Sequence, residues 1–374
     1  MWFSPEDRRQ LVLKPGDLLV SEGGDVGRSC LWANELDPCG FQNSVNRVRP
    51  QSGNSSRFLY YWMSMLKDKG YIDILCNKST IAHFTAEKVA AVPVPYPTVV
   101  EQWQIAAFLD RATAKIDTLI GEQQRLIELL KEKRQAIVSH AVTKGLNPDA
   151  PMKPSGVEWF GEVPAHWRVR KMKWVAEMES GHTPDNKIPA YWENCEIPWV
   201  SLNDTAYLKD HDYISETAYY INELGIANSS ARLLPARAVV FSRDATIGRC
   251  AITTRPMAVS QHFIAWICSD SILPEYLLLR LRSMTQELNR LTTGATLKTI
   301  GMPDVRTLVT PLPPVAEQAA IVKQLGASTM ALDALTAEAE SAIALLQERR
   351  IALVSAAVTG KIDGRGLADA AEAA

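Results

Sequence analysis

In this chain of 374 residues, the side chains that could catalyse a reaction or hold a metal ion are histidines and closely spaced acidic and lysine residues. The segment Pro184–Lys187 contains a D-x-K pair that a nuclease could use to hold a metal ion, but it lies in a turn-rich stretch. His83, His182, His211 and His262 have no carboxylate or cysteine neighbour at the spacing of metal ligands. The sequence also lacks the phosphate-loop, dinucleotide, zinc-protease and G-x-S-x-G motifs. These observations favour a binding protein over an enzyme.

The composition is that of an ordinary globular protein. The chain is long enough for two or three domains, with 47% apolar residues, 22% charged residues and a net charge of −2. The 6 cysteines are scattered, so we expect reduced thiols rather than a zinc site or a disulfide framework. The sequence has neither an apolar run of about 18 residues, as a membrane span requires, nor a signal peptide at its start. These features predict a cytoplasmic protein without a membrane partner.

The chain repeats itself after 216 residues. The phrase EKRQAIVSHAVTKG at 132–145 returns as ERRIALVSAAVTGK at 348–361, and Pro93–Asp110 aligns with Val309–Gly326. Further matches, with small shifts, are LLVSEGGDVGR at 18–28 with VVFSRDATIGR at 239–249, FQNS at 41–44 with SQHF at 260–263, and KSTIAHF at 78–84 with GATLKTI at 294–300. Each copy is a globular part followed by a long helix. The globular parts differ in sequence while the helical parts agree. This indicates two globular parts with different recognition tasks, held by one common pair of helices.

The helical parts carry a coiled-coil pattern. Apolar or small residues recur in steps of four and three, with prolines before each helix and a glycine after it. The first seam is Ile105, Leu109, Ala112, Ile116, Leu119, Leu126, Leu130 and Ile137, interrupted by Gln123 and Lys133. The second is Ile321, Leu325, Leu332, Leu335, Ala339, Ala342, Leu346 and Leu353. A helix of about 43 residues spans about 65 Å. We therefore expect the two helices to pair antiparallel; the alternative is that each packs on its own globular part.

Charge is polarised within the second globular part. Residues 177–223 hold ten acidic and two basic side chains, whereas residues 224–310 hold ten basic and five acidic ones. A basic stretch in a near-neutral protein suits a surface that contacts phosphates. It also suits helix surfaces linked by salt bridges, and charge alone leaves both interpretations open.

Several motifs in one order resemble a known family. Residues 155–204, with P-A-H-W, S-G-H-T-P and I-P-W-V-S, resemble the opening of a target-recognition domain in the specificity subunit of type I restriction-modification systems. The entry PLPPVAEQAAIV into a long helix that ends LVSAAVTGKID is similar to the same family. The resemblance covers the whole chain from about residue 11 onward.

The resemblance implies a recognition subunit that is not itself an enzyme. Two α/β (α+β) target-recognition domains, joined by long antiparallel coiled-coil helices in a pseudo-twofold duplication, would read a bipartite target in double-stranded DNA. Two methyltransferase subunits and two restriction-translocase subunits would be the partners. S-adenosylmethionine, ATP and magnesium would belong to those partners, with no cofactor in this chain. The expected boundaries are 1–98 for the first recognition domain, 99–145 for the first spacer helix, 146–166 for a linker, 167–313 for the second recognition domain, 314–360 for the second spacer helix and 361–374 for a tail.

The first copy departs from the family pattern. The internal alignment places Met1 near Asn222, so the stretch Trp167–Ile221 has no counterpart in the first copy. We expect the first recognition domain to be N-terminally incomplete. A rival hypothesis is a truncated decoy that binds methyltransferase subunits through its helices without productive DNA recognition. A fused enzyme that modifies and cuts by itself is disfavoured, because the sequence lacks a methyltransferase motif of the N-P-P-[YF] type.

The resemblance also selects candidate DNA contacts. Base edges are read by Arg, Asn, Gln, His, Ser or Thr side chains, and phosphates by Arg, Lys or hydroxyl groups. In the second domain the candidates are Ser201, Asn203, Arg243, Gln261, His262, Thr296 and Lys298. In the first domain they are Gln42, Asn43, Lys78 and Thr80. Each of them could instead serve only as a turn residue or a helix cap.

Overall fold

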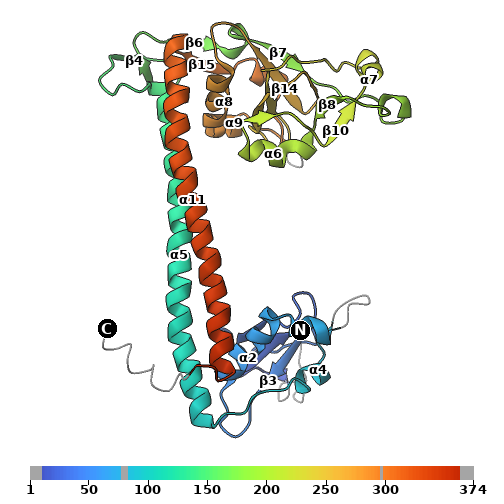
Figure 1. Cartoon of the computed structure of the whole chain (residues 1–374), viewed down its shortest axis with the longest axis vertical. Coiled ribbons are helices and arrows are strands. Elements are labelled where there is room, and N and C mark those ends of the chain that lie inside the picture. Colours follow the sequence, from blue (N-terminus) through green and yellow to red (C-terminus); the bar gives the residue numbers. More distant parts are fainter. Residues whose placement is uncertain (1–10, 77–82, 295–297, 363–374) are drawn as a thin grey trace. The chain divides into compact units, whose positions relative to one another are not determined.

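The chain forms two compact units, each of which includes part of both long helices. The computed structural model describes residues 11–76, 83–294 and 298–362. Unit 1 comprises Met1–Ile127 with Thr336–Ala374, and unit 2 comprises Glu128–Leu335. The long helices are α5 (Val99–Lys144) and α11 (Val315–Val358), seen in Figure 1. No helix among the described residues is long and apolar enough to cross a membrane.

The globular part of unit 1 is a small sheet covered by helices. Its antiparallel sheet has the order β2-β1-β3. The elements are β1 (Leu18–Ser21), β2 (Ser29–Leu31), β3 (Val45–Val48), α2 (Ser56–Asp68), α3 (Tyr71–Leu75) and α4 (Ala86–Ala90). Leu18, Phe58 and Phe84 are fully buried here and share one core with Leu109 of α5 and Val354 of α11. The globular part of unit 1 therefore packs directly on both helices.

Unit 2 is built around a five-stranded sheet with the order β7-β14-β11-β12-β9. A second sheet has the order β10-β8-β13, and two ribbons pair β15 with β6 and β4 with β5. The strands are β4 (Met152–Pro154), β5 (Glu162–Pro164), β6 (Arg168–Lys171), β7 (Ala176–Ser180), β8 (Ile197–Val200), β9 (Tyr213–Ile214), β10 (Tyr219–Ile221), β11 (Val239–Ser242), β12 (Cys250–Thr253), β13 (Ala258–Val259), β14 (Phe263–Cys268) and β15 (Val309–Leu312). The helices are η1 (Met172–Trp174), η2 (Pro189–Tyr191), η3 (Leu202–Asp204), α6 (Thr205–Asp210), α7 (Glu223–Ala227), α8 (Pro274–Ser283), α9 (Thr285–Arg290) and α10 (Met302–Val305).

The duplication expected from the sequence is confirmed by hydrogen bonds. In unit 1 the Ser21 amide donates to the Arg28 carbonyl at 2.9 Å, and in unit 2 the Ser242 amide donates to Arg249 at 2.8 Å. The three strands β2-β1-β3 thus correspond to β12-β11-β14, which β7 and β9 flank in unit 2. Gly27 and Gly248 occupy the same place in the two hairpins, with φ of 76° and 88°. This left-handed conformation explains why the glycine is common to both copies.

A buried glutamine joins each long helix to its recognition part in the same way. Gln102 of α5 accepts from the Ser55 amide at 3.0 Å and donates to the Pro97 carbonyl at 3.1 Å. Gln318 of α11 accepts from the Leu273 amide at 2.8 Å and donates to the Pro313 carbonyl at 2.9 Å. Ser55 and Leu273 are the N-cap residues of α2 and α8. The glutamine of the repeated E-Q pair therefore accepts from the N-cap amide of the neighbouring helix, one of the backbone N–H groups that have no partner within that helix.

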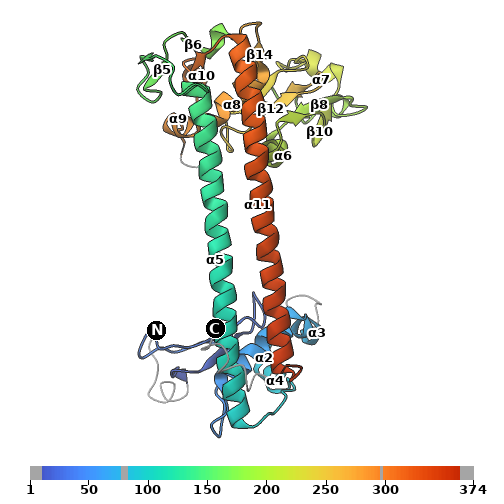
Figure 2. The same ribbon diagram turned by 60° about the vertical axis from the view of Figure 1, so that its left-hand side comes forward.

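The two long helices run antiparallel within each unit and follow one heptad frame. Figures 1 and 2 show α5 and α11 side by side. The buried or half-buried seam positions of α5 are 102, 106, 109, 113, 116, 120, 123, 127, 130, 134, 137 and 141. In α11 they are 318, 322, 325, 329, 332, 336, 339, 343, 346, 350, 353 and 357, which is the same series displaced by 216. The expectation of antiparallel pairing therefore holds inside each unit.

Three of the leucines assigned to the seam from sequence need correction. Leu119, Leu126 and Leu335 are 44%, 42% and 49% exposed, respectively. Ile120, Ile127 and the polar Gln123 take the seam positions in this part of α5. The seam assigned from the sequence followed the most apolar side chains. In the structure, α5 and α11 instead keep the same heptad positions throughout, and Gln123 is accommodated at one of them.

Candidate nucleic-acid interface

Four of the side chains predicted to contact DNA lie close together in unit 2. Gln261 and His262 precede β14, Arg243 follows β11, and Lys298 lies in the segment that returns to the sheet. The Arg243 amide donates to the His262 carbonyl at 3.0 Å, and the Ala245 amide donates to the Lys298 carbonyl at 2.8 Å. The fold thereby brings three separate loops to one end of the sheet.

The Arg243 side chain links two of these loops by hydrogen bonds. Its Nε donates to the Gln261 carbonyl at 3.2 Å, and a terminal nitrogen donates to the Ile300 carbonyl at 3.1 Å. A second terminal nitrogen lies 3.7 Å from the Asp244 carboxylate, and the side chain is only 22% exposed. Much of its donor capacity is used inside the protein, so Arg243 shapes the surface that Gln261 and His262 present.

Asp244 is the centre of the cluster and was not singled out from the sequence. It is 5% exposed, and its Oδ2 lies 2.8 Å from His262 Nδ1. The Thr299 hydroxyl donates to the other carboxylate oxygen. Beyond His262, the Gln261 amide nitrogen lies 3.3 Å from His262 Nε2, and the Thr183 hydroxyl donates to the Gln261 amide oxygen. These contacts form one connected hydrogen-bond network.

Ser201 and Asn203 lie after β8, as predicted, but in different environments. Ser201 is 5% exposed and forms a capping box with Asp204, accepting from the Asn203 amide at 3.3 Å. Its hydroxyl therefore stabilises the turn into η3, and its position lends no support to a DNA contact. Asn203 is exposed. Thr296 lies outside the described residues.

A basic groove of about 450 Å³ adjoins the polar cluster. Among the described residues, its lining contains no aspartate or glutamate but five cations, namely Arg134, Lys209, Arg249, Arg282 and Lys298. Two of these cations also have carboxylate partners, because Arg134 bonds to Asp333 at 3.1 Å and Arg282 bonds to Asp212. Lys298 immediately precedes Thr299 of the Asp244 network. Of the basic residues at 224–310, Arg249, Arg282 and Lys298 line this groove. Most of the others follow the salt-bridge interpretation, because six of the ten pair with carboxylates, namely Arg232, Arg237, Arg243, Arg255, Arg282 and Arg290.

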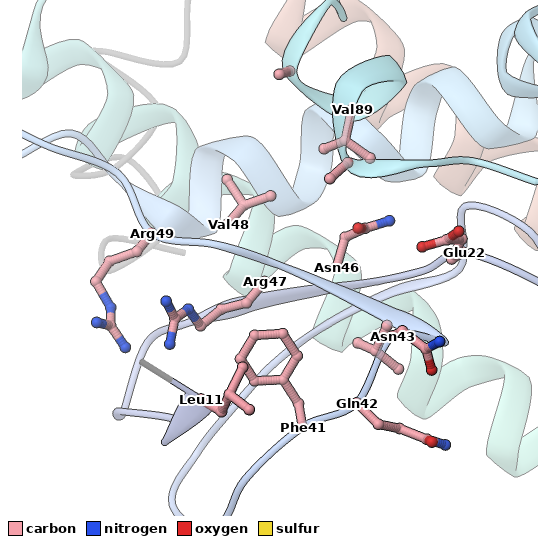
Figure 3. Close-up of a pocket in the computed structure, with 13 residues that line it drawn as sticks. Leu11, Glu22, Phe41, Gln42, Asn43, Asn46, Arg47, Val48, Arg49 and Val89 are labelled. Atoms are coloured by element: carbon pink, nitrogen blue, oxygen red, sulfur yellow. The ribbon is translucent and has the colours of Figure 1, made fainter. Parts of the chain in front are cut away.

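In unit 1, Gln42 and Asn43 line a pocket of about 820 Å³, shown in Figure 3. The pocket lies along β3, with Phe41, Arg47 and Arg49 also on its wall. The Arg47 guanidinium lies 5.0 Å from the centre of the Phe41 ring. This pocket combines amides, guanidinium groups and an aromatic ring, which are side chains that can contact bases and phosphates. Lys78 and Thr80 lie outside the described residues.

Strand register changes which residues of the two domains correspond. Ser21 pairs with Val45 in unit 1, and Ser242 pairs with Phe263 in unit 2. Asn43 therefore corresponds to Gln261, whereas the sequence alignment matched Gln261 with Gln42. The displacement of one residue arises because the loop before β3 does not match the loop before β14 residue for residue. By the same register, Glu22 takes the place of Arg243.

Asp17 and Arg49 stabilise the wall of the unit 1 pocket. Asp17 is 1% exposed, and Arg49 donates two hydrogen bonds of 2.6 Å to its two carboxylate oxygens. Burial by itself would raise the pKa of Asp17. The hydrogen bonds from Arg49 and the Lys14 amide outweigh that effect, so the pKa of Asp17 lies below its ordinary value.

The sequence motifs considered for catalysis take ordinary structural roles. The Asp185 carboxylate accepts from the Lys187 amide at 2.9 Å, which makes the D-x-K pair a local turn. The His182 amide donates to the Val259 carbonyl of β13 at 3.1 Å, and the ring Nδ1 of His211 lies 3.0 Å from the Tyr207 carbonyl of α6. Within the described residues, no group of three His, Cys, Asp or Glu side chains is placed to hold a metal ion.

Two mixed helix-and-sheet parts on a duplicated pair of long helices define a class of two-domain proteins built on a helical frame. A family model described as the type I restriction modification DNA specificity domain matches residues 5–129 and 164–343. The chain belongs to this family, as the resemblance in its motifs predicted. This is a family of specificity subunits rather than catalytic ones.

Two relatives from Methanocaldococcus jannaschii differ in how much of them the chain matches. It is 30% identical to the type I restriction enzyme MjaIX specificity subunit over 168 residues, which cover 44% of this chain but only 38% of that relative. It is 23% identical to the MjaVIII specificity subunit over 369 residues, which cover 96% of this chain and 82% of the relative.

Two solved structures share the fold. A chain from a study of complex assembly and conformational transition of the type I R-M system has a TM-score of 0.66 and 18% identity, over 93% of this chain and 82% of the other. The HsdS subunit from Thermoanaerobacter tengcongensis has a TM-score of 0.53 and 19% identity, over 94% and 82% of the two chains. At these identities the similarity shows the architecture alone.

Proposed function

We propose that this chain recognises a bipartite sequence in double-stranded DNA as the specificity subunit of a type I restriction-modification complex. The basic groove of unit 2 carries the proposal, because cations that include Lys209, Arg249 and Lys298 line it and suit a phosphate backbone, whereas Arg134 and Arg282 are paired with Asp333 and Asp212. The adjoining amide and imidazole groups of Gln261 and His262 suit base edges. In unit 1, the different side chains along β3 would read a second, unlike half-site.

A salt-dependent binding measurement tests the groove. Replacing Lys209, Arg249 or Lys298 by alanine should weaken binding of the full chain to all duplex sequences alike and reduce the salt slope by about 1 for each phosphate contact that the substitution removes. Lys323→Ala is a matched control, because Lys323 is an exposed cation on α11 outside the groove. Unchanged affinity and salt slope in the three groove variants would rule out the proposed phosphate surface.

We propose that methyltransferase subunits dock on exposed leucines of the long helices. Leu119 and Leu335 are equivalent after the shift of 216 and are 44% and 49% exposed. Leu129 and Leu345 are likewise equivalent and are 45% and 65% exposed. Each unit contains one member of each pair, so the same apolar features occur twice on the frame. Two copies of one partner would suit such repeated features.

Lysine substitutions can separate docking from folding. Leu119→Lys with Leu335→Lys should leave the chain folded and abolish co-purification with its methyltransferase subunit. Leu130 is 8% exposed, so Leu130→Lys should instead destabilise the chain by burying a charge. Ala337→Lys changes an exposed position of α11 and serves as the control. Retention of the partner by the folded double variant would contradict the docking proposal.

Catalysis is proposed to reside in the partners, which are methyltransferase and restriction-translocase subunits. S-adenosylmethionine, ATP and magnesium would be bound by these partners. The alternative of a decoy that binds methyltransferase subunits without reading DNA is not favoured, because unit 2 keeps a basic groove and an ordered polar cluster. Methylation mapping with co-expressed partner subunits distinguishes the two, since a decoy would add no modified sequence to the map.

A further inference from the structure

With His262 as a neutral imidazole, the hydrogen bonds around Asp244 have one consistent direction. A carboxylate can only accept, so His262 must donate to Asp244 through Nδ1, where the two atoms are 2.8 Å apart. A neutral imidazole then accepts at Nε2, which lies 3.3 Å from the Gln261 amide nitrogen. The Thr183 hydroxyl donates to the Gln261 amide oxygen, so both ends of the amide are assigned. The network thus fixes which way the Gln261 side chain faces.

The fixed amide still has capacity for a ligand. A glutamine amide offers two N–H donors and two acceptor lone pairs. Within the part of the chain that the structure describes, His262 and Thr183 engage one N–H and one lone pair of Gln261. Because Gln261 is exposed, a second N–H and a second lone pair can meet a group outside the protein. They form a donor and an acceptor side by side in a set orientation.

We propose, on the basis of the proposed DNA recognition, that Gln261 reads an adenine in the major groove and that His262, Asp244 and Thr183 are its positioning residues. Adenine presents the N7 acceptor beside the N6 donor, which matches the two remaining groups of Gln261. Guanine presents two acceptors there, which leaves the amide oxygen without a donor. Thymine and cytosine each present one polar group on that edge and satisfy only half of the amide.

Unit 1 does not repeat this network. By strand register, Asn43 takes the place of Gln261 and Ser44 takes the place of His262. Gly23 follows Glu22 as Asp244 follows Arg243, so the carboxylate that orients His262 has no counterpart at that position. The adenine preference is therefore assigned to the half-site read by unit 2, at one base pair.

Selection of bound duplexes from a random-sequence DNA library, with the full chain, tests the proposal. Wild type should select A·T at one position, and Gln261→Ala should reduce that preference by roughly 5- to 150-fold while other positions keep theirs. Thr183→Val should weaken the preference at the same position, whereas Thr183→Ser, which retains the hydroxyl, should preserve it. Gln286→Ala, at an exposed glutamine of α9, is the matched control and should change no position.

The outcomes distinguish a failure of the adenine assignment from a failure of the proposed DNA recognition. If wild type selects a sequence but Gln261→Ala keeps every preference, the adenine assignment is wrong and DNA recognition stands. Equal loss at all positions in Gln261→Ala and Thr183→Val would also overturn it, because these residues would then only support the loop. If wild type selects no sequence, the proposed function fails and the assignment fails with it.

Discussion

The guanidinium of Arg350 in α11 donates to the carboxylate of Asp117 in α5, with Nε 3.2 Å from Oδ1. The same contact occurs between Arg134 and Asp333 at 3.1 Å, with the roles of the helices exchanged. Each residue of one pair lies 216 positions from its equivalent in the other, and each pair lies within one unit. The duplication has therefore preserved specific contacts between the helices as well as their sequence pattern.

These two ion pairs should contribute little and equally to stability. Arg350 is 28% exposed and Asp117 is 56% exposed, so we expect a coupling energy of about 0.2–1 kcal/mol for each pair. Double-mutant cycles with Asp117→Asn and Arg350→Gln, and with Asp333→Asn and Arg134→Gln, measure it from urea unfolding. Both coupling energies should fall at high salt. A difference between them well above 1 kcal/mol would show that the two contacts are not equivalent.

The buried glutamines should matter more than the ion pairs. Gln318 is 0% exposed and bonds to the Leu273 amide and the Ser271 and Pro313 carbonyls. Gln318→Met would leave these groups without their partner, at a cost of about 1–3 kcal/mol. Hydrogen exchange of the Leu273 amide should accelerate in this variant and remain unchanged in Gln324→Met, an exposed position of the same helix. Unchanged exchange in Gln318→Met would show that the hydrogen bond from the Leu273 amide to Gln318 does not protect this helix end.

Acid should destabilise unit 1 through Asp17. Because the pKa of Asp17 is lower in the folded state than in the unfolded state, its contribution is present above the unfolded pKa of about 3.9 and is lost as the pH falls through the folded value. Arg49→Met removes the group that outweighs burial, so acid unfolding should begin at higher pH. Amide exchange of unit 1 across a pH series measures this. The exposed Arg28 supplies the control variant Arg28→Met, which should leave the transition in place.

The sequence predicted the repeated frame well because its signals are local and periodic. Steps of three and four, prolines before the helices and glycines after them indicated α5 and α11 correctly. Leu119 and Leu126 were misassigned because a heptad pattern read from one helix cannot distinguish a leucine in the seam from one on the outer face. That distinction depends on the facing helix, whose Arg350 and Leu346 occupy the seam in the same frame.

The candidate site was predictable by residue type but not by role. Gln261, His262 and Lys298 meet at one end of a sheet, which their separate motifs did not predict, and their contact with DNA stays a prediction. Ser201 is instead a buried cap. Asp244 was not predicted from the sequence, because a carboxylate would repel DNA phosphates. Its contacts with His262 and Thr299 arise only in the tertiary structure. Lys209 and Arg249 likewise join one groove only through the tertiary fold.

The proposed reading of two half-sites predicts that helix length sets the spacing between them. Four residues inserted after Gln123 alone would lengthen α5 by about 6 Å but shift its seam out of the heptad frame. Seven residues inserted after Gln123 in α5, together with seven after Ile343 in α11, keep both seams in frame, because Asp117 facing Arg350 places these points opposite one another.

That paired insertion should lengthen the frame by about 10 Å, close to three base pairs at about 3.4 Å each. Methylation mapping with the partner subunits should then find unchanged half-sites separated by a spacer about three base pairs longer. The four-residue insertion in α5 alone is the comparison, and it should lower stability without giving a defined new spacer. An unchanged spacer in a stable, active complex carrying the paired insertion would mean that the helices hold the units without measuring the distance between half-sites.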